Sequence, residues 1–385
     1  MNAFFRAALV IYLVATGLGE LLRTSMVIPV EGLSFGNGVH AHSHTLYFGW
    51  AALGLFALFF ARVGAHDVAV KRALGSVVLL SLATFAAFLH SGYRAPGIAV
   101  STLSLAVWAF AAKVFLARAK ALTSMDATFL RVGIAYIGVA GLSAAVRVAL
   151  LVAKVEDPLY GRLAVFGFLR AFATFFEFGL MGLLVHHLSS SGARLDTRAL
   201  RWQLGFMVPL SALTFPLGVR GGMDSVFGPT ARLAAVLLLV SSFLWVRQLW
   251  HGAKALPGSE RAFVVSLAAA WALKALLEVA GALGLAESAV AARHPAMLYV
   301  HLELLGIVTA GLFFLMRKSM GTSSTTPLWA HQGGVLVMLT GLGLSGAHRL
   351  GLAMAAVGGA LVWLSGAWVA HDAFRAGALE SVPPS

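Results

Sequence analysis

The chain has 385 residues, of which 59% are hydrophobic and only 11% are charged. A soluble globular domain carries about twice this share of charged residues, so the composition excludes an ordinary soluble protein. The net charge of +13 would suit a nucleic-acid-binding protein, but the basic residues lie mostly in short loops, as membrane topology requires. We therefore expect no nucleic-acid partner.

The chain has no cysteine. Disulfides, cysteine-held iron–sulfur clusters and thiolate metal ligands are therefore excluded. Any metal would have to be held by His, Met, carboxylate or backbone groups.

Apolar stretches long enough to cross a bilayer recur along the whole chain, and they do not alternate as membrane strands would. We predict an all-α fold, a polytopic membrane bundle of about twelve transmembrane helices that forms a single integral membrane domain over residues 1–385. The predicted spans are 4–28, 44–61, 71–90, 96–117, 127–153, 159–185, 202–219, 229–249, 261–285, 295–316, 327–345 and 351–371.

The ends of the spans predict their orientation. Lys and Arg are roughly twice as frequent in the segments on the N-terminal side of the predicted bundle as on the opposite side, which favours an N-in, C-in protein. The first span follows a single Arg and lacks a convincing A-x-A cleavage site, so we expect an uncleaved first helix. The expected location is a bacterial inner membrane, with the lipid bilayer as the first partner.

Two histidines open hydrophobic spans that match without a gap. The second span reads SHTLYFGWAALGLFALFFAR from residue 43, and the tenth reads VHLELLGIVTAGLFFLMRK from residue 300. Both contain the frame H-x4-G-x4-G-L-F-x-L, which begins at His44 in one and at His301 in the other. A histidine inside a membrane is costly unless it has a partner or a task. The match suggests one cofactor gripped from opposite sides; the alternative is an accidental match of two interfacial histidines.

The two imidazoles are also predicted to lie at similar depth. His44 precedes Arg62 by 18 residues, and His301 precedes Arg317 by 16 residues. At about 1.5 Å per residue, each would lie roughly 24–27 Å from the inner basic residues, near the outer face. A haem between two helices requires this arrangement, and neutral imidazole is a good axial ligand. Arg349, in the outer loop between the last two spans, could contact haem propionates.

Further histidines surround this pair. In VHAHSHT, His40 and His44 share a face if the segment is helical and His42 points away, whereas all three lie on one side if it is extended. Either geometry could bind copper or zinc, and the alternative is a polar start of the span. Spacing leaves open whether His42 or His44 would be the haem ligand, although the matched frame favours His44. His294, seven residues before His301, could contact a second metal or simply begin the helix.

Charged residues inside the spans form pairs along the helices, which reduces the cost of burying them. Such pairs could hold the bundle together or line a path, so a multi-pass transporter or permease without a cofactor is the alternative function. Arg147 and Glu303 have no obvious local partner. The pairs are Glu20 with Arg23, Lys274 with Glu278, and Arg170 with Glu177.

The pattern also supports a family comparison. Twelve spans with histidines on the second and tenth resemble subunit I of the haem–copper oxidases. The string VHAHSHTLYFGW is similar to the H-A-H-x-x-L-x-G-F signature of NnrS proteins, haem- and copper-containing membrane proteins associated with nitric oxide stress. The stretch HLELLGIVTAGLFFLMRKSMGTSSTTPL is loosely similar to another segment of that family. There His301, Gly306 and Met316 are in register, Arg317 and Gly321 come one residue early, and Glu303 and Thr309 replace the expected Leu and Gly.

The resemblance covers two segments of some twenty to thirty residues. It implies a low-spin b-type haem held by His44 (or His42) and His301, and a separate copper at His40 or His42. It does not extend to a binuclear centre. The outer ends of the sixth and seventh predicted spans lack the copper-binding histidines of the oxidases, and the tenth lacks their second histidine. We expect a haem protein of nitric oxide response or electron transfer, with a small gaseous ligand or a redox partner, and no reduction of oxygen or nitric oxide at a binuclear centre.

Overall fold

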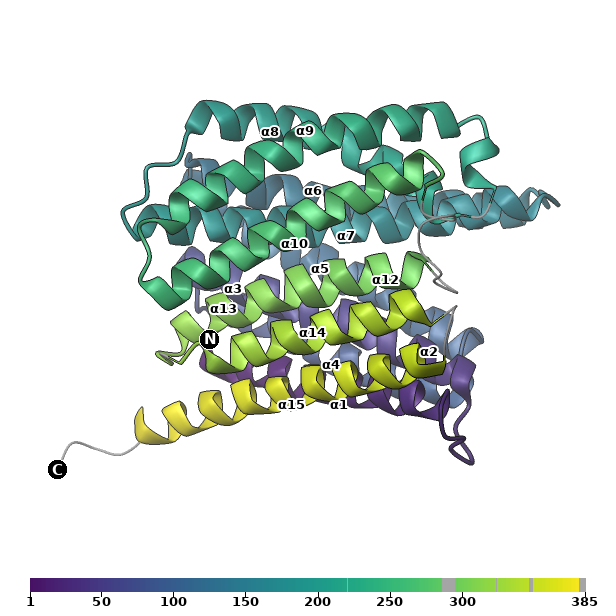
Figure 1. Cartoon of the computed structure of the whole chain (residues 1–385), viewed down its shortest axis with the longest axis horizontal. Helices are drawn as coiled ribbons and strands as arrows, with labels where there is room; N and C mark the ends of the chain where they lie inside the picture. Colours follow the sequence, from purple (N-terminus) through teal and green to yellow (C-terminus); the bar gives the residue numbers. More distant parts are fainter. Residues whose placement is uncertain (220, 286–294, 323, 346–348, 381–385) are drawn as a thin grey trace. The chain divides into compact units, whose positions relative to one another are not determined.

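The computed structural model describes the chain except for residues 220, 286–294, 323, 346–348 and 381–385. The described residues are overwhelmingly helical and include no strand, which confirms the all-α prediction (Figure 1). Each predicted span falls on a helical segment. The elements are α1 (Asn2–Ser25), α2 (Phe35–His44), η1 (Thr45–Ala51), α3 (Ala52–Arg62), α4 (Val68–Ser91), α5 (Ala95–Arg118), η2 (Ala119–Ala121), α6 (Met125–Val152), α7 (Pro158–Ser190), α8 (Thr197–Leu210), η3 (Ser211–Gly218), η4 (Gly222–Asp224), α9 (Gly228–Ala253), α10 (Gly258–Ala282), α12 (Pro295–His301), η5 (Leu302–Thr309), α13 (Ala310–Ser319), α14 (Thr326–Leu344) and α15 (Arg349–Glu380).

Among the described residues, ten helices are long and apolar enough to cross a membrane. The chain is therefore an integral membrane protein by helix length and composition. The predicted span 202–219 differs from an unbroken helix, because α8 ends at Leu210 and continues as the 3-10 turns of η3. Pro209 and Pro216 lie in these two segments, and proline lacks the N–H that continues an α-helix.

The helices group into two compact units. Unit 1 consists mainly of Met1–Ala121 and Val308–Ser385, and unit 2 of Leu122–Ala291 and Pro295–Ile307. The expectation of a single domain over residues 1–385 stays a prediction. The candidate span Met297–Ser319 begins in unit 2 and ends in unit 1.

In unit 1, α1 contacts α15 and α2, α4 contacts α5, and α14 lies along α15 (Figure 1). The α14–α15 contact is close because glycines replace side chains where the backbones meet. A Cβ at Gly334 would lie 2.8 Å from the backbone nitrogen of Val362 and 3.1 Å from the carbonyl oxygen of Gly358. Small residues of this kind let helices approach inside a membrane, where packing replaces the hydrophobic effect.

The second and tenth predicted spans meet inside unit 1. Nε1 of Trp50 in η1 donates to Oγ1 of Thr309 at 2.9 Å, and the rings of Trp50 and Phe313 lie 5.2 Å apart. Further along, a Cβ at Gly54 would lie 3.3 Å from Leu312. The contacts advance together along both segments, so these two helices run in the same direction.

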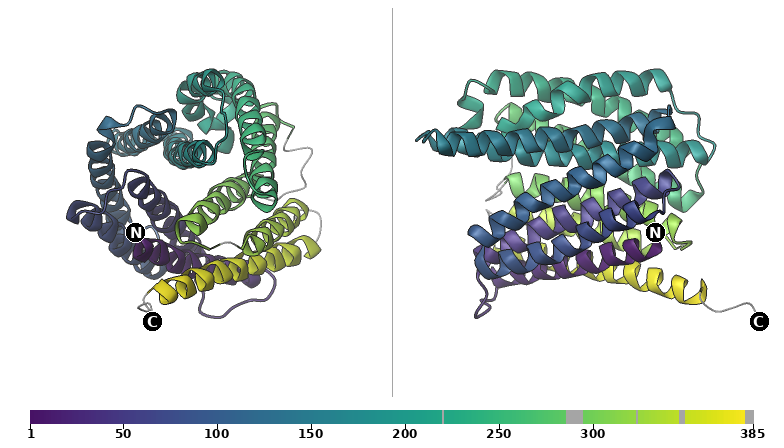
Figure 2. Two further views of the ribbon diagram at one scale, coloured as in Figure 1. Left: turned by 90° about the vertical axis from the view of Figure 1, so that its left-hand side faces the viewer. Right: turned by 180° about the vertical axis from the view of Figure 1, so that it is seen from behind.

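In unit 2, α6 contacts α7, and α9 contacts both α8 and α10. In the end-on view of Figure 2, the helices of this unit run side by side. Of the ten candidate spans, α7 has the largest share of buried residues and α6 the smallest. Apolar side chains on α6 such as Leu142 and Val152 are exposed, as expected of a helix that faces lipid.

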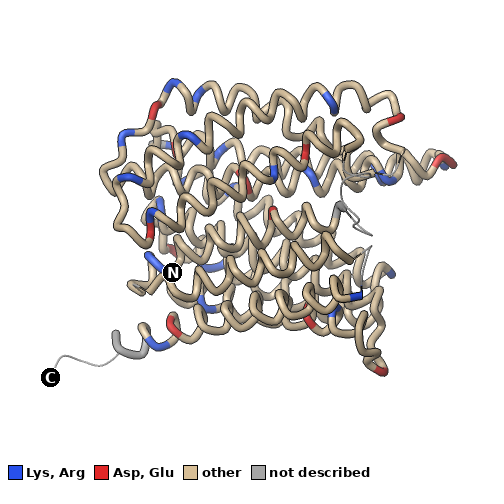
Figure 3. Tube along the Cα trace, viewed as in Figure 1, with Lys and Arg blue, Asp and Glu red and all other residues tan. Residues whose placement is uncertain are grey.

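Lys and Arg gather towards helix ends, as Figure 3 shows along the trace. Arg62 lies in the last turn of α3 and Arg118 in the last turn of α5. At the start of α4, the Asp67 carboxylate accepts from the amides of Ala69 and Val70 and from Arg118 at 2.8 Å. These hydrogen bonds, the one from Arg118 foremost, hold the pKa of Asp67 below its usual range.

We predict that Gly334→Ala lowers the unfolding temperature. The Cβ of the new alanine would lie too close to backbone atoms of Val362 and Gly358 in α15, and these atoms cannot rotate away as a flexible side chain could. Overpacking of this kind costs about 1–3 kcal/mol. Gly333→Ala is the matched control on the same helix, since a Cβ there meets nothing within 4 Å. Thermal unfolding of both variants in detergent checks the prediction. Equal midpoints for the two variants would show that the close approach of α14 and α15 contributes nothing.

Candidate functional site

His44 is the last residue of α2, and the π-helical segment η1 begins with the next residue. Its Nδ1 lies 3.0 Å from the carbonyl oxygen of His40. A carbonyl oxygen only accepts hydrogen bonds, so Nδ1 carries the proton and Nε2 has the free lone pair. The hydroxyl of Tyr93, 2.9 Å away, donates to Nε2. The tautomer of His44 is therefore set by its own helix.

Aromatic rings surround His44 within unit 1. Its ring centroid lies 4.2 Å from that of Phe88 and 5.4 Å from those of Phe48 and Tyr93. His40 lies on the same face, with its ring 4.4 Å from Tyr93. Burial raises the pKa of Tyr93, so this phenol stays protonated and able to donate. His44 thus lies among aromatic rings, with Nε2 as its accepting atom.

His42 points the other way. The segment Phe35–His44 is helical, so the helical alternative of the sequence analysis holds, with His40 and His44 on one face. Nδ1 of His42 lies 2.7 Å from the carbonyl oxygen of Ala15 in α1. A Cβ at Gly19 would collide with the His42 ring. His42 is therefore part of the α1–α2 contact, which leaves His44 as the better candidate ligand.

His301 repeats the local geometry of His44. It is the last residue of α12, and the π-helical segment η5 begins at Leu302. Its Nδ1 lies 2.7 Å from the carbonyl oxygen of Met297, four residues earlier. Each histidine of the matched sequence frame therefore makes the same kind of hydrogen bond to its own helix, and each is followed by a π-helical segment. π-Helical turns are rare and occur frequently at functional sites.

The other predicted ligands are less well supported. Arg349 is the first residue of α15 and is exposed. His294 lies outside the described residues. Among the residues that the structure describes, no group of three or more His, Asp or Glu side chains converges as a metal site. The copper predicted at His40 and His42 stays a prediction, and their rings lie on different faces of α2.

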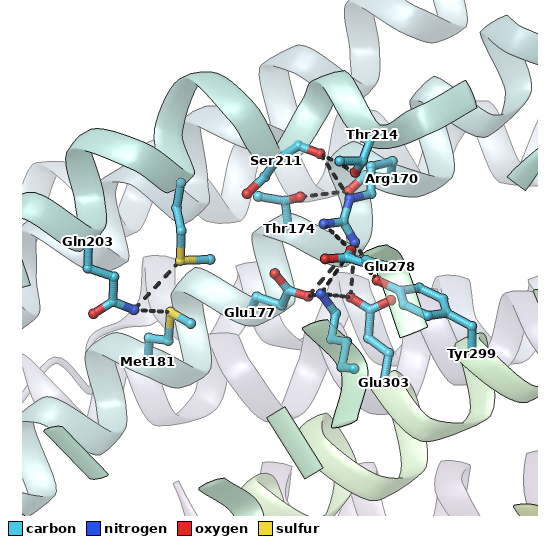
Figure 4. Close-up of polar contacts among 12 residues, drawn as sticks. Arg170, Thr174, Glu177, Met181, Gln203, Ser211, Thr214, Glu278, Tyr299 and Glu303 are labelled. Atoms are coloured by element: carbon cyan, nitrogen blue, oxygen red, sulfur yellow. Dashed lines mark hydrogen bonds and ion pairs between the residues drawn. The ribbon is translucent and has the colours of Figure 1, made fainter. Parts of the chain in front are cut away.

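A second constellation lies wholly within unit 2, and we call it the ion cluster (Figure 4). Its five charged side chains are buried, and its tyrosine is partly buried. It brings together three stretches that are far apart in the sequence, namely α7, α10 and the consecutive elements α12 and η5. Its members are Arg170 and Glu177 of α7, Lys274 and Glu278 of α10, Tyr299 of α12, and Glu303 of η5.

The predicted pairs exchange partners in the structure. Arg170 lies 2.8 Å from Glu278 but 4.0 Å from Glu177. Lys274 lies 2.7 Å from Glu177 and 3.2 Å from Glu278. The pairs expected along single helices are thus the longer ones, because side chains of different helices meet more directly. Glu303, which had no local partner in the sequence, lies 3.7 Å from Arg170 and 4.0 Å from Lys274.

Hydrogen bonds extend the cluster to η3 and α12. Nε of Arg170 donates to the carbonyl oxygen of Ser211 at 2.9 Å, where α8 changes to 3-10 turns. Nη1 of Arg170 donates to the hydroxyl of Tyr299 at 2.9 Å, and that hydroxyl donates to Glu278 at 2.5 Å. Sequence spacing could not reveal these contacts, since Ser211 and Tyr299 carry no pattern that distinguishes them.

Comparison with models of protein families and with curated proteins finds no match to this chain.

We predict that Lys274→Met strongly destabilises the protein, because three buried carboxyl groups would face one remaining cation. Removing one partner of a buried ion pair costs about 3–5 kcal/mol. Arg118→Met is the control, since it removes an exposed cation that pairs with exposed Asp67; it should change the unfolding midpoint little. Thermal unfolding in detergent measures both. A Lys274→Met midpoint equal to that of Arg118→Met would contradict the prediction.

Proposed function

We propose that this chain is a haem-binding integral membrane protein in which His44 and His301 hold one b-type haem near the outer face. The observation that carries the proposal is the local geometry shared by the two histidines. Each ends an α-helix, precedes a π-helical segment, and has Nδ1 at hydrogen-bond distance from the carbonyl oxygen four residues earlier.

The donor chemistry fits a haem iron. A hydrogen bond from Nδ1–H to a backbone carbonyl fixes the tautomer, leaves Nε2 as the binding atom and raises its basicity. Tyr93 now donates to Nε2 of His44, and would give up this bond when Nε2 binds iron. Tyr93 is only partly buried beside His44, with 55% of the residue exposed, so its hydroxyl can bond to water instead. Phe48 and Phe88 supply the apolar surface that a porphyrin face requires.

Both proposed ligands precede, along their own helices, a contact between the second and tenth spans that lies within unit 1. Trp50 and Thr309 meet in unit 1, six residues after His44 and eight residues after His301. At about 1.5 Å per residue, these separations are roughly 9 and 12 Å along each helix. Gly54 permits the close approach of Leu312, since a Cβ there would lie 3.3 Å from that side chain.

A haem with two imidazole ligands supplies one-electron chemistry and has no open position on its iron. Electron transfer to a redox partner is therefore the simplest task, and a response to nitric oxide would require the gas to replace one histidine. This proposal keeps the resemblance to NnrS proteins and to the low-spin haem site of the haem–copper oxidases. The proposed copper at His40 or His42 has less support, because the two rings lie on different faces of α2.

The proposed topology has twelve spans, with both termini in the cytoplasm of a bacterium and the chain in its inner membrane. The positive-inside bias of the loops supports it. A reporter enzyme that is active only in the periplasm, fused after residue 376, should be inactive, and the same fusion after residue 26 should be active. Activity in the reverse order would exclude this orientation.

A transporter or permease without a cofactor is the second candidate, and the ion cluster favours it. Buried ionisable groups within membrane spans often mark substrate or ion paths. On this alternative the purified protein is colourless, and Glu278→Gln abolishes solute uptake into vesicles without a spectral change. Uptake that is unaffected by Glu278→Gln would count against it.

We predict that the protein, expressed with haem supplied and purified in detergent, contains about one b-type haem per chain. Its dithionite-reduced minus oxidised spectrum should show a sharp α-band, and the pyridine haemochrome assay gives the haem content. The double variant His44→Ala, His301→Ala should lose the haem, whereas His42→Ala is the control and should keep it if folded. Full haem content in the double variant would refute the paired-histidine proposal.

A further inference from the structure

We propose that one end of unit 2 binds the headgroup of an anionic phospholipid through Arg198, Arg201 and Arg247. This surface, which we call the arginine end, lies where α8 begins and α9 ends. The inference depends neither on the haem proposal nor on the ion cluster. It names one partner within the bilayer, a lipid with a negatively charged headgroup.

The first argument is the register of the two helices. The amide of Asp196, the residue before α8, donates to Oε1 of Gln248 at 3.0 Å. The hydroxyl of Ser241 donates to the carbonyl oxygen of Gln203 at 3.3 Å. The two contacts lie seven residues apart on each segment, so α8 and α9 run antiparallel in a constant register.

This register brings the three arginines to similar depth. At about 1.5 Å per residue, Arg198 differs from Arg247 by roughly 2 Å along the helix pair, and Arg201 differs from Arg247 by roughly 6 Å. All three are exposed, and among the described residues no carboxylate forms an ion pair with their guanidinium groups. Like charges at one depth repel each other, and an anion between them removes this repulsion.

Neighbouring acidic groups do not neutralise the arginine end. In the described segments 122–131, 186–203 and 243–264, the acidic residues are Asp126, Asp196 and Glu260. Asp126 is buried 3.7 Å from His186, and Glu260 is also buried. Asp196 is exposed, and its carboxylate accepts from two amides in the first turn of α8. The three arginines therefore outnumber the one exposed carboxylate (Figure 3).

Aromatic and apolar side chains indicate that the anion is a lipid. Trp202 on α8 and Trp250 on α9 are exposed beside the arginines, and tryptophan is enriched at the border between the hydrocarbon and the headgroups. Further from this end, Val208 and Phe243 are exposed on the same two helices. A phospholipid matches both parts of this surface, with its phosphate at the arginines and its acyl chains along the apolar side chains. A free anion would use the arginines alone.

The experiment exploits the absence of cysteine from the chain. Gly205 lies one turn from Arg201 on the exposed face of α8, and a Cβ there meets nothing within 4 Å. A fluorophore is attached to the Gly205→Cys variant of the full chain in vesicles, where phospholipids with brominated acyl chains quench it on contact. Quenching by brominated phosphatidylglycerol, compared with brominated phosphatidylcholine, gives the relative affinity for the anionic headgroup.

The label at position 205 should prefer phosphatidylglycerol. One arginine near an anionic lipid contributes about fivefold in affinity. Arg201→Gln should therefore lower the relative affinity about fivefold, and the triple variant Arg198→Gln, Arg201→Gln, Arg247→Gln should abolish the preference. Thermal unfolding should be nearly unchanged, because these side chains are exposed.

Two controls separate the arginine end from general effects of charge. Arg232→Gln removes an exposed arginine at the opposite end of α9 and should leave the preference unchanged. A label on Gly138→Cys, at an exposed position of α6 where a Cβ meets nothing within 4 Å, should show no preference between the two lipids.

Several results would overturn the proposal. They are equal quenching by the two lipids at position 205, an equal preference at positions 138 and 205, and an unchanged preference in the triple variant. Loss of the preference on addition of inorganic phosphate, at an ionic strength matched with chloride, would also do so, because the anion alone would then suffice. The haem content is not measured in this experiment, so its failure would leave the haem proposal standing.

Discussion

Backbone N–H and C=O groups have no water to bond inside a bilayer, so each span must satisfy these groups within itself or against buried neighbours. This constraint explains why the described residues of each predicted span are mostly helical. It also makes the exceptions informative. The π-helical segments η1 and η5 begin immediately after His44 and His301, and the 3-10 segment η3 offers the Ser211 carbonyl to Arg170. The irregular backbone in the spans thus lies beside the candidate functional side chains.

Buried charge is the second constraint, and it organises unit 2. The ion cluster joins α7, α10, α12 and η5, and its carboxyl groups outnumber its cations. Tyr299 and Glu303 belong to this cluster, while His301 lies between them in the chain. One short segment therefore carries both a candidate metal ligand and two members of the ion cluster.

The positions of the spans could be predicted because hydropathy is local. A run of apolar residues identifies a helix wherever its neighbours lie, and each predicted span coincides with helical structure. The predicted span 202–219 was wrong in one respect, since Pro209 and Pro216 accompany a change from α-helix to 3-10 turns. The matched frame at His44 and His301 was also visible, because it is a pattern of residues along the chain.

Partners across helices could not be predicted, because they depend on which helices pack together and how each is rotated. The sequence by itself determined the all-α membrane class, the approximate positions of the helices and the placing of Arg170 with Glu177, and of Lys274 with Glu278, as neighbours along their own helices. Only the tertiary structure decided that Arg170 lies nearer Glu278, that Lys274 lies nearer Glu177, and that Glu303 joins them. The tertiary structure also decided that the His42 side chain points towards α1 and that His44 accepts a hydrogen bond from Tyr93. The physical reason is range: helix formation follows from bonds four residues apart, whereas a side chain's partner follows from the fold of the whole unit.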